Sequence, residues 1–508
     1  MADLWTVLLH QFSTYSHFRG VWLDMNEPAN SCDGHCSAQS RQTRGAPSMR
    51  ELLGERAWAD PRPARAPRGV HGHGDAVREN TLQAPLYPVN NGGKCLPLNA
   101  FTVDMDARLH GGVVYDVKNL YGFVQTRATW RALLESDSNK RPFVLSRATS
   151  PGSGRYGAHW LGDNLSSWEY MKYSVAGMLQ FQLFGIPLVG ADICGFDGDT
   201  TESLCARWMA LGAFYPFSRN HNSYDAIPQE PYRWPSVLDV SKRALAMRYS
   251  LLPYYYTQFH FAHTRGVTVV KPLFFQFPTE PEVHTRDVVD VQFLIGDALM
   301  VVPVLEAEGA DYPVFFPRSA KWFDMWTLTR VESEGWARVN ASLSLRPVLL
   351  YQRVGSIVAM HDVQATNERA IRPHSLVAVI GEDYTASGSL YLDDGESFAY
   401  RTSGVWQLIS MSFSASQGGR NTFKFYQSSR VDISFYKVAR LDSVKLVGLQ
   451  RTPRQLNVQV MGWDDKGLYN QEIIVWNHWR FDASSRTLFV ENLKQPLVSS
   501  FEIWWDDF

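Results

Sequence analysis

The sequence lacks long apolar runs and any marked excess of one charge. No stretch of the 508-residue chain approaches the roughly 18 to 20 uninterrupted apolar residues that a membrane span requires. Its 49 Lys and Arg nearly balance its 51 Asp and Glu, which gives a net charge of −2. A charge this small provides no basic field for nucleic acid or an anionic membrane surface. We therefore expect neither a nucleic-acid partner nor a membrane span, and the sequence leaves the oligomeric state open.

Cysteine is also scarce. The five cysteines are too few and too scattered for a disulfide-rich scaffold. Cys32 and Cys36 have C-x3-C spacing, but no pair of His or Cys at ligand spacing follows, so zinc is not expected. Isolated bridges are the better interpretation. The first residues lack the basic segment of a signal peptide, and no metal or cofactor is expected.

The first half of the chain alternates short apolar runs with helix-like segments. This pattern is typical of β/α units around a parallel sheet. The predicted strands are 20–23, 142–145, 158–161, 187–191 and 267–274. A helix is predicted from about 166 to 183, opened by Ser166 and Ser167 and closed by Gly185. A segment near 40–95 interrupts the pattern, and we expect it to be disordered because 57–80 is rich in Pro, Arg, Gly and His.

The second half has a different pattern. After residue 277, short alternating runs are separated by turn residues, as in 312–317, 389–395 and 423–426. Such runs predict an all-β region, which we divide into two β-sandwiches, 278–364 and 365–508. The predicted fold class is therefore α/β plus all-β, with the α/β part in residues 1–277.

Charged residues follow the predicted strands. Loops at the C-terminal ends of parallel strands converge, so these side chains are expected to share one site. The residues are Asp24, Arg147, Asp163, Asp192, Arg219 and His221. Two carboxylates across a pocket suit glycoside hydrolysis, in which one attacks the anomeric carbon and the other protonates the departing oxygen. An Asp at a strand end is also a common helix cap or structural hydrogen-bonding group. Position alone therefore does not decide between a catalytic and a structural role for these residues.

Two sequence blocks carry a family resemblance. The run Trp22-Leu23-Asp24-Met25-Asn26-Glu27-Pro28 resembles the nucleophile signature of glycoside hydrolase family 31. The run Ser146-Arg147-Ala148-Thr149, followed by His159-Trp160-Leu161-Gly162-Asp163-Asn164, resembles its acid/base region. Further matches lie at 190–196, 211–222, 296–299 and 393–397. Within the family the chain resembles most the group of lysosomal acid α-glucosidase and intestinal maltase and sucrase.

The resemblance implies a role for each matching residue. Asp24 would be the nucleophile and Asp163 the acid/base, with Glu27 behind them. Arg147 would keep Asp24 ionised, and His221 would bind hydroxyls of the non-reducing glucose. The remaining expected substrate-binding residues are Trp22, Met25, Trp160, Asp192 and Phe196. For Asp192, a structural role is as consistent with the sequence as a substrate-binding role.

The resemblance also bears on the cysteines and on the compartment. It implies a Cys194–Cys205 bridge, and Cys36 with Cys95 as a possible second one. Disulfides favour an oxidising compartment, so a secretory, lysosomal or vacuolar, or extracellular location is expected. Asn340-Ala341-Ser342 is an acceptable glycosylation sequon, whereas a second sequon at Asn164 falls at the expected active site and is discounted.

The family's barrel places the nucleophile after its fourth strand, yet few residues precede Asp24. We therefore expect a fragment that carries barrel strands 4 to 8, without the first three, followed by two β-sandwiches. The expected function is a retaining exo-α-glucosidase acting on α-1,4-linked glucose of an α-glucan or oligosaccharide, with the α-1,6 linkage as a further candidate. The alternatives are a non-catalytic derivative whose β-sandwiches bind carbohydrate or protein, and a glycoprotein-trimming enzyme like glucosidase II.

Overall fold

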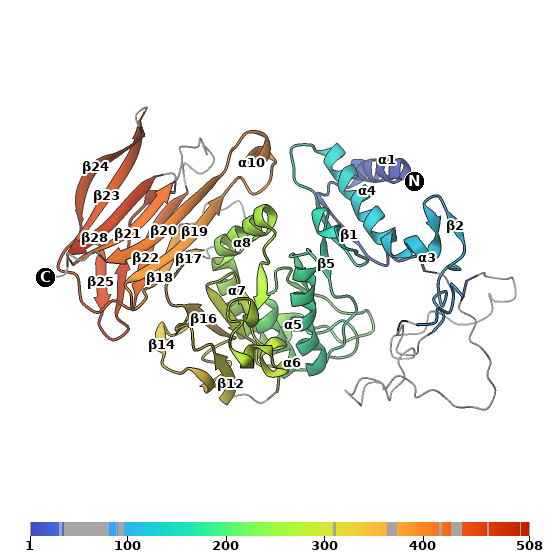
Figure 1. Ribbon diagram of the computed structural model, residues 1–508, viewed down its shortest axis with the longest axis horizontal. Helices are drawn as coiled ribbons and strands as arrows, with labels where there is room; N and C mark the ends of the chain where they lie inside the picture. The colour runs from blue at the N-terminus through green and yellow to red at the C-terminus, as the bar shows by residue number, and fades with distance from the viewer. Residues whose placement is uncertain are drawn as a thin grey trace.

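The computed structural model describes residues 2–29, 33–34, 81–87, 89, 96–307, 311–362, 373–415, 419–427, 439–464, 467–497 and 499–506. The chain runs from an α/β part that holds the N-terminus, through a mixed middle part, to a β-rich part that holds the C-terminus (Figure 1). Within these ranges, no helix is both long and apolar enough for a membrane span. The segment 57–80 and the Cys36–Cys95 pair lie outside the described residues.

A four-stranded parallel sheet forms the core of the first part. Its strands, in spatial order, are β1 (Gly20–Leu23), β4 (Phe143–Ser146), β5 (Ala158–Trp160) and β6 (Val189–Gly190). Leu23 pairs with Ser146, which in turn pairs with His159. Beyond β6, strand β7 (Asp192–Ile193) pairs in parallel with β8 (Arg219–Asn220). The first four predicted strands are confirmed, and their C-terminal ends meet at one edge.

Helices cover this sheet. Helices α1 (Ala2–Tyr15) and α4 (Tyr121–Ser136) lie side by side and pack on β1 and β4 through a small core of Leu23, Leu133 and Val144 (Figure 1). The indole of Trp5 donates to Thr129 Oγ1 at 2.8 Å and joins the two helices. Short elements of the α/β part are β2 (Arg108–Leu109), β3 (Gly112–Val113), α3 (Val114–Val117), η3 (Lys118–Leu120), η4 (Ser153–Arg155) and η5 (Pro231–Arg233).

Helix α5 (Trp168–Leu183) is the helix predicted near 166–183. The Ser167 hydroxyl caps it by accepting a hydrogen bond from the backbone N–H of Tyr170, and Gly185 follows it with φ +77°. Its apolar positions are buried as the spacing predicts: Met171, Val175, Met178 and Leu179. They enter the largest core of the molecule, which α6 (Glu202–Gly212), α7 (Pro235–Ser250) and α8 (Leu252–Arg265) complete.

The fifth predicted strand does not join the parallel sheet. Strand β9 (Val270–Pro272) pairs antiparallel with β10 (Phe293–Ile295). The N–H groups of Val269 and Val270 donate to Gln182 Oε1 at 3.0 and 3.4 Å, so this side chain takes the place of a strand there. The prediction of 267–274 as a strand of the parallel sheet is therefore wrong. An apolar run identifies a buried strand, but its hydrogen-bonding neighbour depends on residues far along the chain.

The middle part is a six-stranded sheet with a two-stranded antiparallel sheet over it. The sheet order is β14-β13-β16-β11-β10-β9, and β12 with β15 encloses a separate apolar core against it. The further strands are β11 (Leu299–Val302), β12 (Asp311–Phe316), β13 (Trp322–Asp324), β14 (Thr329–Val331), β15 (Gly335–Asn340) and β16 (Leu349–Arg353). Short helices lie between β9 and β10 in the chain: η6 (Leu273–Phe275), η7 (Pro281–His284) and α9 (Arg286–Val289).

The last part is a single 12-stranded sheet that surrounds one core. Leu376 and Leu446, from strands near one end of the path, share this core with Phe423 and Phe501. The strands are β17 (Ser356–His361), β18 (His374–Val379), β19 (Thr385–Leu392), β20 (Gln407–Ala415), β21 (Arg420–Gln427), β22 (Arg440–Val447), β23 (Leu456–Asp464), β24 (Gly467–Trp476), β25 (Trp479–Asp482), β26 (Thr487–Val490), β27 (Gln495–Pro496) and β28 (Ser500–Asp506). Helix α10 (Ala399–Thr402) follows β19. The domain boundaries near 277 and 364 stay predictions.

Candidate active site

Two carboxylates converge on one guanidinium at the C-terminal edge of the parallel sheet. Asp24 follows β1 and Arg147 follows β4, and the Arg147 N–H donates to Leu23 O at 3.0 Å. Arg147 Nη1 lies 3.3 Å from Asp24 Oδ1 and 4.0 Å from Asp163 Oδ2. Because both contacts are made to this one nitrogen, the two oxygens are at most about 7.3 Å apart. This limit includes the separation of about 5 to 5.5 Å typical of retaining glycosidases and the lower end of the range of about 6.5 to 9.5 Å typical of inverting ones.

Glu27 holds Arg147 in place. Its two oxygens accept from Arg147 Nε at 2.8 Å and Nη2 at 2.7 Å, a bidentate pair that fixes the guanidinium plane. Burial acts to raise the pKa of Glu27, but the hydrogen bonds and charge of Arg147 outweigh it and lower the pKa. Glu27 is therefore an anion that orients Arg147 and leaves Nη1 for the two aspartates.

The turn after β1 is tightly specified. Met25 has φ +50°, a left-handed conformation that is unfavourable for this side chain, and its N–H donates to Asp24 Oδ1 at 2.8 Å. The buried Asn26 donates to Ser146 Oγ at 2.9 Å and accepts from the Ala148 N–H at 2.8 Å. Asn26 thus ties the turn that carries Asp24 to the turn that follows Arg147.

The environment of Asp163 favours its protonated form. Burial raises the pKa of its carboxyl, Arg147 opposes this shift, and the negative charge of Asp24 adds to it. The side chains of Asp163 and Asp24 are 41% and 36% exposed, so both are reachable from solvent. A carboxyl with a raised pKa beside a second carboxylate is the arrangement that separates an acid from a nucleophile.

A second group of side chains lies next to this pair. Asp192 is fully buried, and Arg219 donates to its Oδ1 from Nη2 at 2.5 Å and from Nε at 3.2 Å. Burial raises the pKa of Asp192, and Arg219 acts to lower it. The Arg219 guanidinium lies 5.0 Å from the ring of Trp22 and 5.3 Å from that of Trp160. The 45% exposed Trp22 offers surface to a ligand, whereas Trp160, 1% exposed, supports it from behind.

His221 and Phe196 complete this group. The His221 ring centroid lies 5.7 Å from that of Trp22 and 5.3 Å from that of Phe196. Burial and the charge of Arg219 lower the pKa of His221, although Asp163 and Asp24 act to raise it. A neutral imidazole next to an exposed indole can exchange hydrogen bonds with a sugar hydroxyl.

Asn164 connects the two groups. Its side-chain amide donates to Asp192 O at 2.9 Å, and its backbone O and Oδ1 accept from the Phe196 N–H at 2.8 and 3.1 Å. With 6% of its surface exposed, Asn164 is inaccessible to a glycan in this fold, in agreement with the discounted sequon. The predicted disulfide between Cys194 and Cys205 is present, with 4.7 Å between the Cα atoms, and closes the loop that carries Phe196 onto α6.

The structure therefore brings most of the predicted residues together. Asp24, Asp163 and Glu27 each contact Arg147. Trp22, two residues before Asp24, contacts Arg219 and His221 of the second group. Met25 is 72% exposed at the edge of this arrangement. Sequence reasoning assigned no role to the buried amides Asn26 and Asn164, although both stand inside the two matching motifs. The sequence feature that could have identified these two amides is their position directly beside a candidate carboxylate.

A parallel β/α sheet with a carboxylate pair at its C-terminal edge is the arrangement found in glycoside hydrolases built on a TIM barrel. The family model of the glycosyl hydrolases family 31 TIM-barrel domain matches residues 1–258, and that of the family 31 C-terminal domain matches 266–358. The chain belongs to glycosyl hydrolase family 31.

Relatives of known name support this assignment. The chain is similar to an α-glucosidase of Aspergillus oryzae (38% identical, 78% of this chain and 43% of that protein). It is also similar to the lysosomal α-glucosidase of Bos taurus (37% identical, 89% of this chain and 45% of that protein). Among solved structures it resembles the glucosidase II alpha subunit, with a TM-score of 0.71 at 30% identity over 80% of this chain and 44% of that chain. The chain thus spans less than half the length of these relatives.

Proposed function

We propose that this chain carries the catalytic centre of a retaining exo-α-glucosidase that releases terminal α-1,4-linked glucose, and α-1,6-linked glucose as well, from oligosaccharides or α-glucans. The observation that carries the proposal is the convergence of Asp24 and Asp163 on Arg147 Nη1, at 3.3 and 4.0 Å. The names of the relatives, α-glucosidases from a fungus and a mammal, supply the expected sugar.

The proposed reaction has two displacements. Asp24 attacks the anomeric carbon while Asp163 donates its proton to the departing glycosidic oxygen, which leaves a covalent glycosyl-enzyme. Asp163, now a carboxylate, takes a proton from water as the water attacks the same carbon and Asp24 departs. Two inversions retain the α configuration. The raised pKa of Asp163 suits the first step, in which it must be an acid.

Sugar binding falls to the second group of side chains. The exposed face of Trp22 would stack on the apolar face of the glucose ring, and His221 would exchange hydrogen bonds with its hydroxyls. Arg219 would hold Trp22 through the cation–π contact at 5.0 Å.

The proposal is tested by release of p-nitrophenol from an α-glucoside by the purified chain and by Asp24→Asn. Loss of the nucleophile is expected to lower kcat by at least about 10³-fold, because the amide cannot form the glycosyl-enzyme. Asp225→Asn, which changes an exposed Asp in a nearby loop, is the matched control and is expected to keep full activity. Equal activity of Asp24→Asn and the native chain would refute the assignment.

A second candidate function is trimming of glycoprotein glycans. The glucosidase II alpha subunit, whose structure was solved with a ligand named alpha3-Glc2, shares this fold at 30% identity. An α-1,3-linked glucose disaccharide and maltose, offered at equal concentration, separate the candidates. Faster cleavage of maltose supports the exo-α-glucosidase, and faster cleavage of the α-1,3 linkage supports the trimming enzyme.

A third candidate is a non-catalytic protein whose β-rich parts bind carbohydrate or protein. Soluble starch in a native gel would then retard the native chain and Asp24→Asn equally, with no release of glucose by either.

We also propose a secretory-pathway location. The Cys194–Cys205 bridge, the exposed sequon at Asn340 and the lysosomal relative support it.

A further inference from the structure

Gln229 lies at a point where several backbone carbonyls converge. Its side chain is 2% exposed, in the segment between β8 and η5. Its Nε2 lies 3.0 Å from Ile193 O, 3.0 Å from Gly195 O, 3.0 Å from Asn220 Oδ1 and 3.2 Å from His221 O. The two N–H groups of the Gln229 amide are thus shared among four acceptors.

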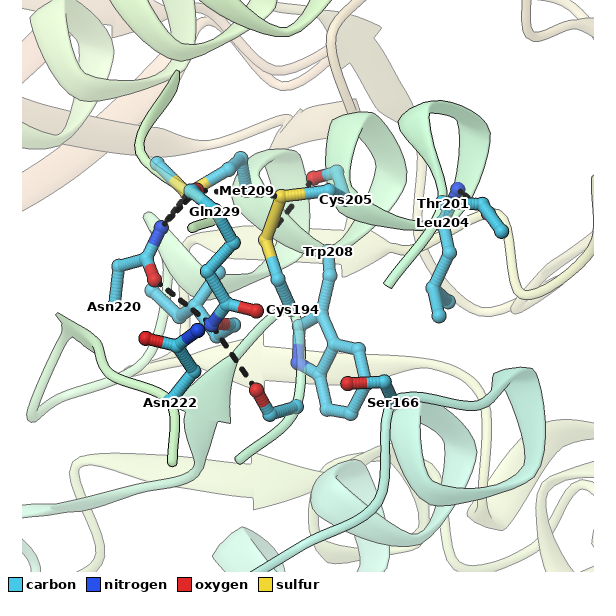
Figure 2. The surroundings of a disulfide bond; sticks show 12 residues. Ser166, Cys194, Thr201, Leu204, Cys205, Trp208, Met209, Asn220, Asn222 and Gln229 are labelled. Carbon is cyan, nitrogen blue, oxygen red and sulfur yellow. Dashed lines mark hydrogen bonds between the residues drawn. A yellow bond between two sulfur atoms is a disulfide. The ribbon is translucent and has the colours of Figure 1, made fainter. Parts of the chain in front are cut away.

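The acceptors flank the side chains of the second group. Ile193 follows Asp192, Gly195 precedes Phe196, and the fourth acceptor is the carbonyl of His221 itself. The backbone O of Gln229 accepts from Asn220 Nδ2 at 3.0 Å, and Cys205 Sγ of the disulfide lies 4.0 Å from the same oxygen. Figure 2 shows Gln229 between Asn220 and the Cys194–Cys205 bridge. One residue therefore joins the loop after β6, strand β8 and the disulfide.

The Gln229 amide has only one workable orientation. A flipped amide would set Oε1 against carbonyl oxygens, which repel it. In the orientation present, Oε1 is buried and has no hydrogen-bond partner, which costs free energy. An isosteric apolar side chain would avoid this cost but would remove the donor that these carbonyls share. The value of an amide at this position is therefore the Nε2 donor that it supplies to the surrounding carbonyls.

We propose that Gln229 is a positioning residue that fixes the Phe196 and His221 wall of the site, and so sets how tightly the terminal glucosyl ring is bound. The inference rests on the proposed function. The residues of the chemical step lie elsewhere: Asp24, Arg147 and Asp163 follow β1, β4 and β5, and none of them contacts Gln229. Loss of the amide therefore weakens binding more than it slows bond cleavage.

The test compares Gln229→Met with Gln182→Met. Both changes remove a buried amide that bonds to backbone and keep the side-chain length, but Gln182 bonds to Pro187 O, Val269 N and Val270 N, away from the site. We expect Gln229→Met to raise KM for the α-glucoside about tenfold with kcat within about threefold of the native value. Gln182→Met is expected to lower stability and leave KM unchanged.

Hydrogen exchange gives a readout that needs no activity. Gln229→Met should lose protection in 192–197 and 219–223, where the Phe196 and Ser223 N–H groups are bonded, and keep it in β12 and β15. Local loss with raised KM supports the inference. Unchanged exchange, unchanged KM, or a fall in kcat as large as the rise in KM overturns it.

The two proposals fail in different ways. If the native chain and Asp24→Asn both release no p-nitrophenol, the proposed function fails for this chain. Hydrogen exchange then decides the inference: loss confined to 192–197 and 219–223 supports Gln229 as the residue that holds this wall, and absence of that loss overturns it.

Discussion

The Asp393 carboxylate links the last β-rich part to the start of strand β4. It is 1% exposed and accepts from Arg141 Nη2 at 3.2 Å, from Tyr391 Oη at 3.1 Å and from the Gly395 N–H at 2.7 Å, and also from Tyr256 Oη. Arg141 stands two residues before β4, which leads to Arg147. An ion pair with a buried carboxylate thus spans the interface between the parallel sheet and the 12-stranded sheet.

Removal of one partner is expected to be costly. Asp393→Asn keeps the shape and one acceptor oxygen but leaves the Arg141 cation, 27% exposed, with only the more distant Asp394 carboxylate, 3.5 Å from Nη2, as its counter-charge. Loss of one member of a buried pair costs about 3 to 5 kcal/mol, and the partial exposure of Arg141 places the expected loss near the lower end, about 3 kcal/mol. Arg141→Met leaves the Asp393 carboxylate buried and unpaired, and a similar loss is expected.

The assay is urea unfolding of the single and double variants, followed by tryptophan fluorescence. Because the partners interact, the double variant should lose about 1.5 to 3 kcal/mol less than the sum of the single losses. Glu382→Gln, which breaks the exposed Arg330–Glu382 pair, is the matched control and should cost less than about 1 kcal/mol. Losses that add within about 0.5 kcal/mol would refute a coupled pair across this interface.

Three further predictions concern stability and pH. Burial lowers the pKa of His159 from 6.5 to about 4, so between these pH values the unfolded chain binds a proton that the folded chain does not bind. As the pH drops from 6.5 to 4, the free energy of unfolding of the native chain, measured with urea, should therefore fall by about 3 kcal/mol more than that of His159→Phe. Removing the disulfide with Cys194→Ala and Cys205→Ala should cost about 3 kcal/mol by the same measurement, since it closes a loop of 11 residues in sequence separation, and an unchanged midpoint would contradict this. Burial raises the pKa of Asp163, so kcat/KM should fall as the pH rises through that pKa, and Asp163→Asn should abolish this limb while aryl glucosides with good leaving groups keep residual turnover.

The sequence predicted the parallel strands and their terminal carboxylates well because both signals are local. The apolar runs that became β1, β4, β5 and β6 end at the polar residues of the site, and parallel pairing then brings Asp24 and Arg147 together. Strand β9 shows the limit, since its apolar run gave no information about β10 as its partner. The choice of neighbour depends on contacts between distant segments.

Side-chain partners were harder to predict than positions. Arg147 was expected to serve Asp24, but its shortest contacts go to Glu27, because a bidentate pair satisfies more of its donors. Trp160 was expected to bind the substrate and is instead buried behind Trp22. Gln229 lies in a Pro-rich segment that reads as an ordinary loop, and only the folded chain shows the carbonyls around it.

The central claim, that Asp24 is the nucleophile of a retaining enzyme, is tested most directly by trapping the covalent intermediate. A fluorinated α-glucosyl fluoride slows the second displacement, so the glycosyl-enzyme accumulates and is detected by mass spectrometry of the digested chain. We predict one added glycosyl group, located on Asp24 and absent from Asp24→Asn. A label on another residue, or turnover of the native chain with inversion at the anomeric carbon, would contradict the account.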